Sequence, residues 1–379
     1  MFKVLNLFKF IFLYNFSYYT ISEVKSLFYS LYNLFDINIF QYITVRAGIA
    51  FAISFFIALF LMPYFIKWAK KQKSSQPIYE LAPKTHQQKV GTPTMGGIVF
   101  VFSTVIATLM TAKLNNIYVV GGLVVIILFA LIGLQDDISK IIKNKNSAGL
   151  SPRAKMILQI IASLFVGGLL ILGGHDTMLY VPFYKNPLVD MQYFALLFWI
   201  VVMVASTNAV NLTDGLDGLA VVPSIIAFFT LGALVYIAGN IVISQYLLLP
   251  SIKNCGELTI IVSAFVGSMI AFLWYNAHPA EVFMGDTGSL SIGGFMGYTA
   301  IVSKSEVLLL LIGFVFVMET ISVILQVGSF KLRQKRVFLM APIHHHFEQL
   351  GWKENKIIVR FWIIAFMTNL LALLTLKVR

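Results

Sequence analysis

The chain has 379 residues, of which 59% are hydrophobic and only 12% are charged, and its mean hydropathy is +0.85. These polar side chains are too few to cover a soluble protein, so the composition predicts an integral membrane protein. The single cysteine, Cys255, excludes an internal disulfide framework and a cysteine-based zinc site. The net charge of +12 could suggest nucleic-acid binding, but the basic residues lie between apolar segments, so we expect membrane topology to explain them and no nucleic acid to bind.

The first forty residues differ from the rest of the chain. Residues 1–40 place Lys3 and Lys9 among aromatic side chains without a small-residue cleavage site, which indicates an interfacial helix, not a signal peptide. Residues 41–379 are predicted to form a single transmembrane domain, an all-α polytopic integral membrane protein. About ten apolar segments approach the roughly 20 residues that span a bilayer: 45–66, 95–112, 117–134, 154–173, 193–210, 218–239, 257–275, 289–303, 306–330 and 357–376.

Local signals mark two of these segments. Ser151 and Pro152 are a favourable N-cap and first residue for the fourth span. Pro223, inside the sixth span, predicts a kink or a tilt there.

The distribution of basic residues predicts the orientation in the membrane. Eighteen lysine and arginine residues follow the first, third and ninth spans, whereas only Lys113, Lys185, Lys253 and Lys304 occupy the loops of opposite parity. Because basic loops stay in the cytoplasm, both termini are expected on the periplasmic side. All the acidic and histidine clusters described below then fall on the cytoplasmic face, which favours one shared active site there.

The first polar motif, KVGTPTMGG, precedes the second span. Its Lys89, Thr94 and paired glycines lead into a helix N-terminus, an arrangement suited to phosphate, although it is not a Walker A loop. The next motif, LQDDISK, places Asp136 beside Asp137 with Lys140 one helical turn later. Adjacent carboxylates repel unless a cation or a proton lies between them, so a Mg²⁺ ion or a general base is the functional interpretation. The alternative is a helix C-terminus ending in water.

The motif NLTDGLDG follows the fifth span. Asn211, Asp214 and Asp217 are spaced i, i+3, i+6, so on a helix they would share one flank and could converge on one ligand. The alternative is an ordinary turn between two hydrophobic helices.

Two further motifs follow the seventh and ninth spans. The motif NAHPAEVFMGDTGS contains Asn276, Phe283 and Asp286. Phe283 could stack on a base or only anchor the chain at the membrane interface. Asp286 is a carboxylate next to a glycine, which suits a metal that keeps water and phosphate ligands. APIHHHFEQLG contains three consecutive histidines, His344, His345 and His346. Since three such side chains cannot point one way on a helix, a loop is expected, with one or two of them facing phosphate. Carboxylates, cations and an aromatic at one membrane face favour Mg²⁺-dependent phosphoryl transfer with a lipid reactant.

The five motifs resemble, in this order and over residues 41 to the C-terminus, those of the phospho-N-acetylmuramoyl-pentapeptide-transferase family. The resemblance implies transfer of phospho-N-acetylmuramoyl-pentapeptide from UDP-MurNAc-pentapeptide to undecaprenyl phosphate, forming lipid I and UMP with Mg²⁺ as cofactor. It also implies the bacterial cytoplasmic (inner) membrane and suggests a homodimer. Two departures are the long N-terminal segment and Leu339, where a basic residue is common.

The resemblance also implies roles for individual residues. Asp286 matches the Mg²⁺-binding aspartate, Asp136 and Asp137 match a pair that activates the substrate or attacks it, and His344 matches a residue needed for activity. The positions that match the nucleotide pocket are Lys89, Asn211, Asp214, Asp217, Asn276 and Phe283, and those near the sugar phosphate are His345 and His346. Direct attack by the lipid phosphate and a two-step route through an aspartyl phosphate both remain open.

Two alternative functions are consistent with parts of the sequence. A related UDP-N-acetylglucosamine:polyprenyl-phosphate transferase would share most motifs, although APIHHHFE separates the two groups. A proton-coupled transporter would account for the polytopic architecture and for Glu319 inside the ninth span, but the acids cluster at one face and not at the bilayer midplane.

Overall fold

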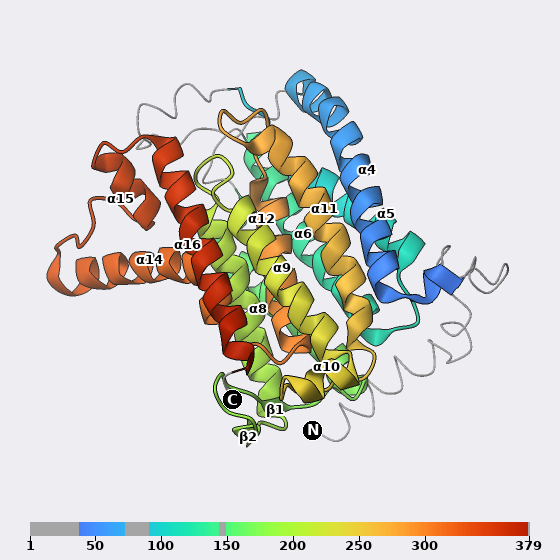
Figure 1. Cartoon of the computed structure of the whole chain (residues 1–379). Coiled ribbons are helices and arrows are strands. Elements are labelled where there is room, and N and C mark those ends of the chain that lie inside the picture. Colours follow the sequence, from blue (N-terminus) through green and yellow to red (C-terminus); the bar gives the residue numbers. More distant parts are fainter. Residues whose placement is uncertain (1–37, 73–90, 144–148, 378–379) are drawn as a thin grey trace.

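The fold is that of an all-α membrane protein, seen in a computed structural model that describes residues 38–72, 91–143 and 149–377 (Figure 1). The elements of the first half are η1 (Asn38–Gln41), α4 (Ile43–Lys71), α5 (Gly97–Thr111), α6 (Ile117–Lys143), α7 (Pro152–Leu172), β1 (Met178–Leu179), β2 (Val189–Asp190) and α8 (Phe194–Thr213). Those of the second half are α9 (Val221–Ala238), α10 (Ile241–Tyr246), η4 (Cys255–Glu257), α11 (Leu258–Asn276), α12 (Gly285–Val302), α13 (Leu309–Ile312), α14 (Phe314–Arg333), α15 (Ile343–Gln349), α16 (Glu354–Leu374) and η5 (Thr375–Lys377). The short strands β1 and β2 pair antiparallel, with Met178 opposite Asp190.

Each of the ten predicted spans coincides with a helix, and the ninth is divided at Gly313 into α13 and α14. Among the described residues, eight helices are long and apolar enough to cross a membrane. The other two are α5, with 15 residues, and α12, which is rich in glycine and serine. The expected all-α polytopic membrane protein is therefore confirmed, while the number of crossings and the side of each terminus stay predictions. The expected interfacial helix over residues 1–40 lies almost entirely outside the described residues.

The kink expected at Pro223 is not required by the structure. Helix α9 begins at Val221, so Pro223 lies in its first turn, where a proline removes no intrahelical hydrogen bond. The proline that lies within a helix is Pro63 of α4.

Helix α12 is the centre of the bundle. Of its eighteen residues, all but Asp286 are buried, and it packs against α5, α6, α8 and α9. Small side chains allow this close approach of helices on several sides. The position explains how Asp286, at the start of α12, comes to lie between the ends of neighbouring helices.

A buried ion pair joins the first transmembrane helix to the rest of the bundle. Arg46 of α4 is fully buried, and its two Nη atoms lie 2.8 and 2.5 Å from the carboxylate oxygens of Glu257, just before α11. A bidentate pair of this kind satisfies both charges in a low-dielectric setting. The ion pair lies at the N-terminal end of α4, and Lys71 lies at the other end of this helix.

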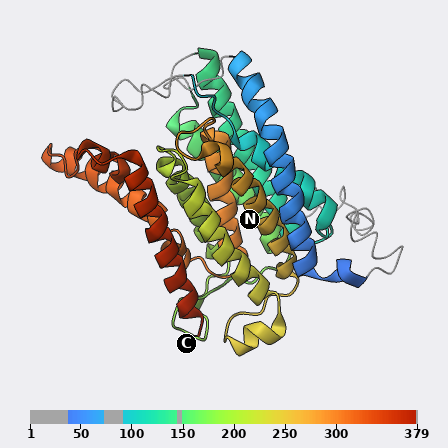
Figure 2. The same cartoon turned by 45° about the horizontal axis from the view of Figure 1, so that its top comes forward.

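Three helices near the C-terminus, which we call the C-terminal unit (α14, α15 and α16), lie against the bundle, where α14 contacts α8 and α16 contacts α9. In Figures 1 and 2 these helices project to one side of the bundle, and α15 lies at the end of the molecule opposite to β1 and β2. A second hydrophobic core, separate from that of the bundle, lies beneath them. Its buried members are Leu216, Leu219, Val315, Ile357, Ile358, Phe361 and Ala365.

Candidate active site

Three carboxylates from two helices meet at the end of the bundle that the charge distribution predicts to be cytoplasmic. Asp136 and Asp137 lie near the end of α6, and Asp286 lies in the first turn of α12. Each offers one carboxylate oxygen within 4.8 Å of the others. Two motifs that are 150 residues apart thus form one cluster, which we call the carboxylate cluster.

Asp137 holds the N-terminus of α12. Its Oδ1 accepts a hydrogen bond from the Asp286 backbone N–H (3.0 Å), and its Oδ2 accepts from the N–H (2.9 Å) and hydroxyl (2.7 Å) of Thr287. A carboxylate at a helix N-terminus satisfies donors that lack intrahelical partners. Gly285 has φ +74°, and a Cβ there would lie 2.7 Å from Asp137 Oδ2, so a glycine is needed.

Asp136 contacts Lys140 and the segment before α7. Its Oδ1 accepts from the Leu150 backbone N–H at 2.7 Å, and its Oδ2 lies 2.5 Å from Lys140 Nζ. The same Lys140 Nζ is 3.0 Å from Asp286 Oδ2, and Lys155 Nζ is 2.7 Å from that oxygen. The two ammonium groups therefore balance much of the charge of the three carboxylates.

Asn211 joins the same cluster from the end of α8. Its amide donates to Asp286 Oδ1 (2.8 Å) and to Ser289 Oγ (2.8 Å). The sequence resemblance assigned Asn211 to the nucleotide pocket, whereas the structure places its amide on the aspartate expected to bind metal. It orients that carboxylate directly.

Sequence reasoning left Lys155 out of the candidate residues, and noted Lys140 only as the neighbour of the aspartate pair. Lys155 is the fourth residue of α7, where the helix dipole disfavours a cation. A lysine in the first turn of a helix, after a strong N-cap, is the feature of the sequence from which an anionic partner could have been predicted. That partner proves to be Asp286.

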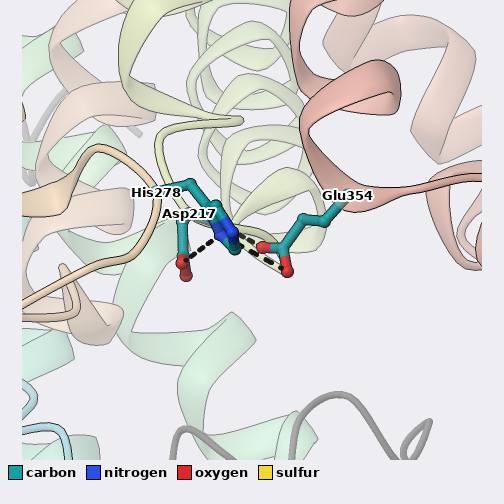
Figure 3. A group of neighbouring side chains, drawn as sticks. All are labelled: Asp217, His278 and Glu354. Atoms are coloured by element: carbon teal, nitrogen blue, oxygen red, sulfur yellow. Dashed lines mark hydrogen bonds and ion pairs between the residues drawn. The ribbon is translucent and has the colours of Figure 1, made fainter.

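A second cluster lies nearby, formed by Asp217, His278 and Glu354 (Figure 3). His278 Nδ1 is 3.0 Å from Asp217 Oδ2 and 3.7 Å from Glu354 Oε2. The three residues come from the turn after α8, the loop after α11 and the first residue of α16. The helical arrangement that would place Asn211, Asp214 and Asp217 on one flank is not found, because α8 ends at Thr213 and the chain turns Asp217 toward this second cluster. Binding of one ligand by these residues stays a prediction.

Asp214 lies between the two clusters, at the C-terminus of α8. Burial, reinforced by the charges of Asp286, Asp137 and Asp217, raises its pKa to about 8. A carboxyl with this pKa is protonated over much of the neutral range. It can then donate a hydrogen bond as well as accept one.

The loop after α11 is tied to two neighbours by Asn276 and Phe283. Asn276 is buried, and its side chain accepts from the Gly218 N–H (3.0 Å) and donates to the Val282 carbonyl (2.9 Å). Phe283 is half-buried, and its backbone donates to Pro93 and accepts from Gly96. Asn276 therefore shapes the loop, and Phe283 keeps a ring available to a ligand.

Of the site residues expected before α5, the structure describes Thr94. Thr94 is buried, with its Oγ1 3.0 Å from the Cβ position of Gly285, so its hydroxyl packs against the start of α12. Lys89 lies outside the described residues.

The three histidines lie on α15, so the expected loop is wrong. The rings of His344 and His345 are adjacent, with centroids 4.1 Å apart. The three histidines have different partners: His344 is fully buried with Nδ1 3.1 Å from Glu319 Oε1, His345 Nδ1 is 2.6 Å from Glu348, and His346 Nδ1 accepts from the Leu339 N–H at 3.2 Å. His344 is buried in this structure, and its catalytic role stays a prediction. Its pairing with Glu319 accounts for an acid inside the apolar α14.

The carboxylate cluster has the donor chemistry that Mg²⁺ prefers, since it offers several carboxylate oxygens and Asp286 remains partly exposed. The second cluster includes an imidazole, a donor that Mg²⁺ takes less readily. Of the two, the carboxylate cluster is the better fit for that ion.

The chain is similar to a family model and to several named bacterial proteins. A family model described as glycosyl transferase family 4 matches residues 119–304. Phospho-N-acetylmuramoyl-pentapeptide-transferase of Aliarcobacter butzleri is 66% identical over 93% of this chain and all of its own length. The proteins of that name from Nitratiruptor and from Campylobacter jejuni (strain 81116) are 63% and 58% identical, again over 93% of this chain, and over 99% and 100% of their own lengths. The chain belongs to the phospho-N-acetylmuramoyl-pentapeptide-transferase family.

Proposed function

We propose that this protein transfers phospho-N-acetylmuramoyl-pentapeptide from its UDP carrier to undecaprenyl phosphate, forming lipid I and UMP in the first membrane step of peptidoglycan synthesis. The observation that carries the proposal is the carboxylate cluster with its two lysines, at one end of a transmembrane bundle. Both reactants are anionic phosphates, and one is a lipid. Phosphoryl transfer between them requires positioning and charge neutralisation, which these groups offer.

Asp286 is the residue that would hold Mg²⁺, with Asn211 orienting its carboxylate. When bound, the ion would lower the repulsion between the two anionic reactants. Lys140 and Lys155 bind phosphate oxygens in this proposal, since each already contacts a carboxylate oxygen at the site.

Asp136 is the member of the pair that acts on the lipid phosphate, because three hydrogen bonds commit both oxygens of Asp137 to the start of α12, whereas Asp136 Oδ2 pairs with Lys140, an ammonium group that a phosphate also attracts. Asp136 accepts the proton of that phosphate or orients it. An oxygen of the lipid phosphate then bonds to the β-phosphorus of the UDP-linked substrate. The bond from that phosphorus to the bridging oxygen breaks, and UMP leaves with the electron pair.

The nucleotide occupies the turn after α8 in this proposal, beside Asp214 and Asp217, with Phe283 against the uracil. The positions of His345 and His346 on α15 are consistent with contacts to the sugar phosphate. The bacterial cytoplasmic membrane and a homodimer complete the proposal, the latter open to test by cross-linking in native membranes.

The deciding experiment supplies purified protein with undecaprenyl phosphate and either UDP-MurNAc-pentapeptide or UDP-N-acetylglucosamine, and measures UMP. Release only from the former is expected. Release from UDP-N-acetylglucosamine alone would refute the substrate assignment. Asp286→Asn should abolish turnover at every Mg²⁺ concentration, and a substrate chiral at the β-phosphorus should give inversion, since retention would require an aspartyl-phosphate intermediate.

A further inference from the structure

The turn between α8 and α9, residues 214–220, is supported from behind by a part of the chain that is remote in sequence. Leu216 and Leu219 of this turn do not pack into the core of the bundle. They are buried in the second hydrophobic core, together with Val315 of α14 and Phe361 of α16. The C-terminal unit therefore holds the apolar side of the turn.

The same unit also contacts the backbone of the turn. The Asp217 N–H donates to Glu354 Oε1 at 3.2 Å, and Trp362 Nε1 donates to the Gly218 carbonyl at 3.2 Å. His344 Nε2 lies only 2.3 Å from the position that a Cβ on Gly215 would occupy, so the imidazole lies directly against that backbone. The backbone of the turn is thus contacted by α15 and α16 at Gly215, Asp217 and Gly218.

Glu354 links this backbone to the side chain of Asp217. Its Oε1 accepts from the Asp217 N–H, while its Oε2 lies 3.7 Å from His278 Nδ1. The same His278 nitrogen is 3.0 Å from Asp217 Oδ2, which also accepts from the Ala280 N–H at 3.1 Å. Figure 3 shows the imidazole between the two carboxylates. The turn, the loop after α11 and the first residue of α16 are thereby joined at one point.

We propose that Glu354 is a positioning residue for nucleotide binding, and that the C-terminal unit sets the geometry of the turn through Glu354 and Trp362. This inference rests on the proposed function, which places the uridine nucleotide at the turn. The turn is neither helix nor strand, and besides its own hydrogen bond from the Leu219 N–H to the Leu216 carbonyl (3.1 Å) it is held by these outside contacts, so they help to set the direction of the Asp214 and Asp217 side chains. Glu354 touches no reacting atom in this arrangement and acts through Asp217.

The test compares Glu354→Ala with Glu354→Gln in the full-length protein. Alanine leaves the Asp217 N–H without its acceptor, and we expect KM for the UDP-linked substrate to rise about tenfold while kcat changes less than about twofold. Glutamine keeps an oxygen for that N–H and should restore KM to within about threefold of the original value. Trp362→Phe, which keeps the ring packing and removes the donor to Gly218, should raise KM in the same way.

Glu281→Ala is the matched control, because Glu281 is an exposed carboxylate of the loop after α11. It should leave both kinetic constants unchanged. Binding of UMP, measured by displacement of a fluorescent nucleotide, should weaken in parallel with KM for Glu354→Ala.

Three outcomes decide the inference. An unchanged KM with less folded enzyme would reduce Glu354 to a structural role and overturn the proposal. A Glu354→Gln variant as impaired as Glu354→Ala would also overturn it, because the hydrogen-bond acceptor would then not be what matters. Failure of the unmodified protein to release UMP would instead refute the proposed function, so the two failures are distinguishable.

Discussion

The two adjacent aspartates should respond differently to the same substitution. Asp137→Asn removes the charge at the N-terminus of α12 and turns an amide NH₂ toward one of three donors, on Asp286 and Thr287. Loss of a charged hydrogen bond costs about 1.5–3 kcal/mol, and loss of the favourable dipole interaction adds about 0.3–1 kcal/mol. The free energy of unfolding should therefore fall by about 2–4 kcal/mol.

Asp136→Asn should have the opposite signature. Asparagine can still accept from the Leu150 N–H through its Oδ1, and the change removes a charge that repels Asp286. The fold should therefore be retained, while turnover should fall by at least about 100-fold because the group facing the lipid phosphate can no longer take a proton.

Thermal unfolding in detergent and UMP release per folded molecule measure the two effects separately. We expect Asp137→Asn to lower the apparent Tm by roughly 4–8 °C and Asp136→Asn to change it by less than about 2 °C. An Asp137→Asn variant that melts normally but is inactive, together with an unstable Asp136→Asn variant, would refute the assignment of these roles.

Three other substitutions test the charges around the site and the fold. Lys155→Gln removes an ammonium 2.7 Å from Asp286 and should lower kcat/KM about 10- to 100-fold in steady-state UMP release, whereas an unchanged value would exclude it from phosphate binding. The pKa of Asp214 is higher in the folded protein than in the unfolded chain, so this group lowers the free energy of unfolding as the pH rises from about 4 to about 8. Asp214→Asn should make that decrease smaller, as measured by melting curves at several pH values. Arg46→Ala should destabilise the fold by up to about 3–5 kcal/mol, because the buried Glu257 would keep only the weaker contacts from Lys113, at 3.3 Å to its N–H and 3.8 Å to its ammonium group. Arg46→Met with Glu257→Leu should recover most of the loss; equal melting of the single and double variants would contradict this.

The helices were predictable from the sequence because long apolar segments can satisfy their backbone polar groups in a bilayer only as helices. The same physics explains the errors. Pro223 suggested a kink only because its distance from the helix start could not be judged to within a turn, and the start at Val221 removes the need for one. The division at Gly313 depends on packing of α13 and α14, which periodicity does not contain.

The convergence of Asp136, Asp137 and Asp286 was predictable from topology, since all three follow spans of the same parity. The sequence did not predict that Asn211 and Asp217 belong to different clusters. Helix α8 ends at Thr213, so Asp217 lies beyond the helix and points in another direction from Asn211. Glu354 carried no distinguishing signal either, since an acid at a helix start is ordinary. Sequence spacing does not determine the direction of a side chain at the end of a helix. This is why some site residues could be assigned to their cluster from the sequence and others could not.

The balance of charge at the carboxylate cluster limits how substrate can bind there. Lys140 and Lys155 both contact Asp286 Oδ2, and an ammonium group leaves a partly buried carboxylate only if another charge takes its place. A diphosphate that binds alone would attract the two lysines and leave the negative charge of Asp286 without a cation. A cation that binds alone would displace the two lysines from Asp286 and leave their positive charges without an anion. Nucleotide diphosphate and divalent cation should therefore bind with mutual reinforcement, each lowering the cost of rearranging the lysines for the other. The coupling resides in Lys140 and Lys155, so replacing either should weaken the dependence of nucleotide affinity on Mg²⁺ concentration as well as the affinity itself.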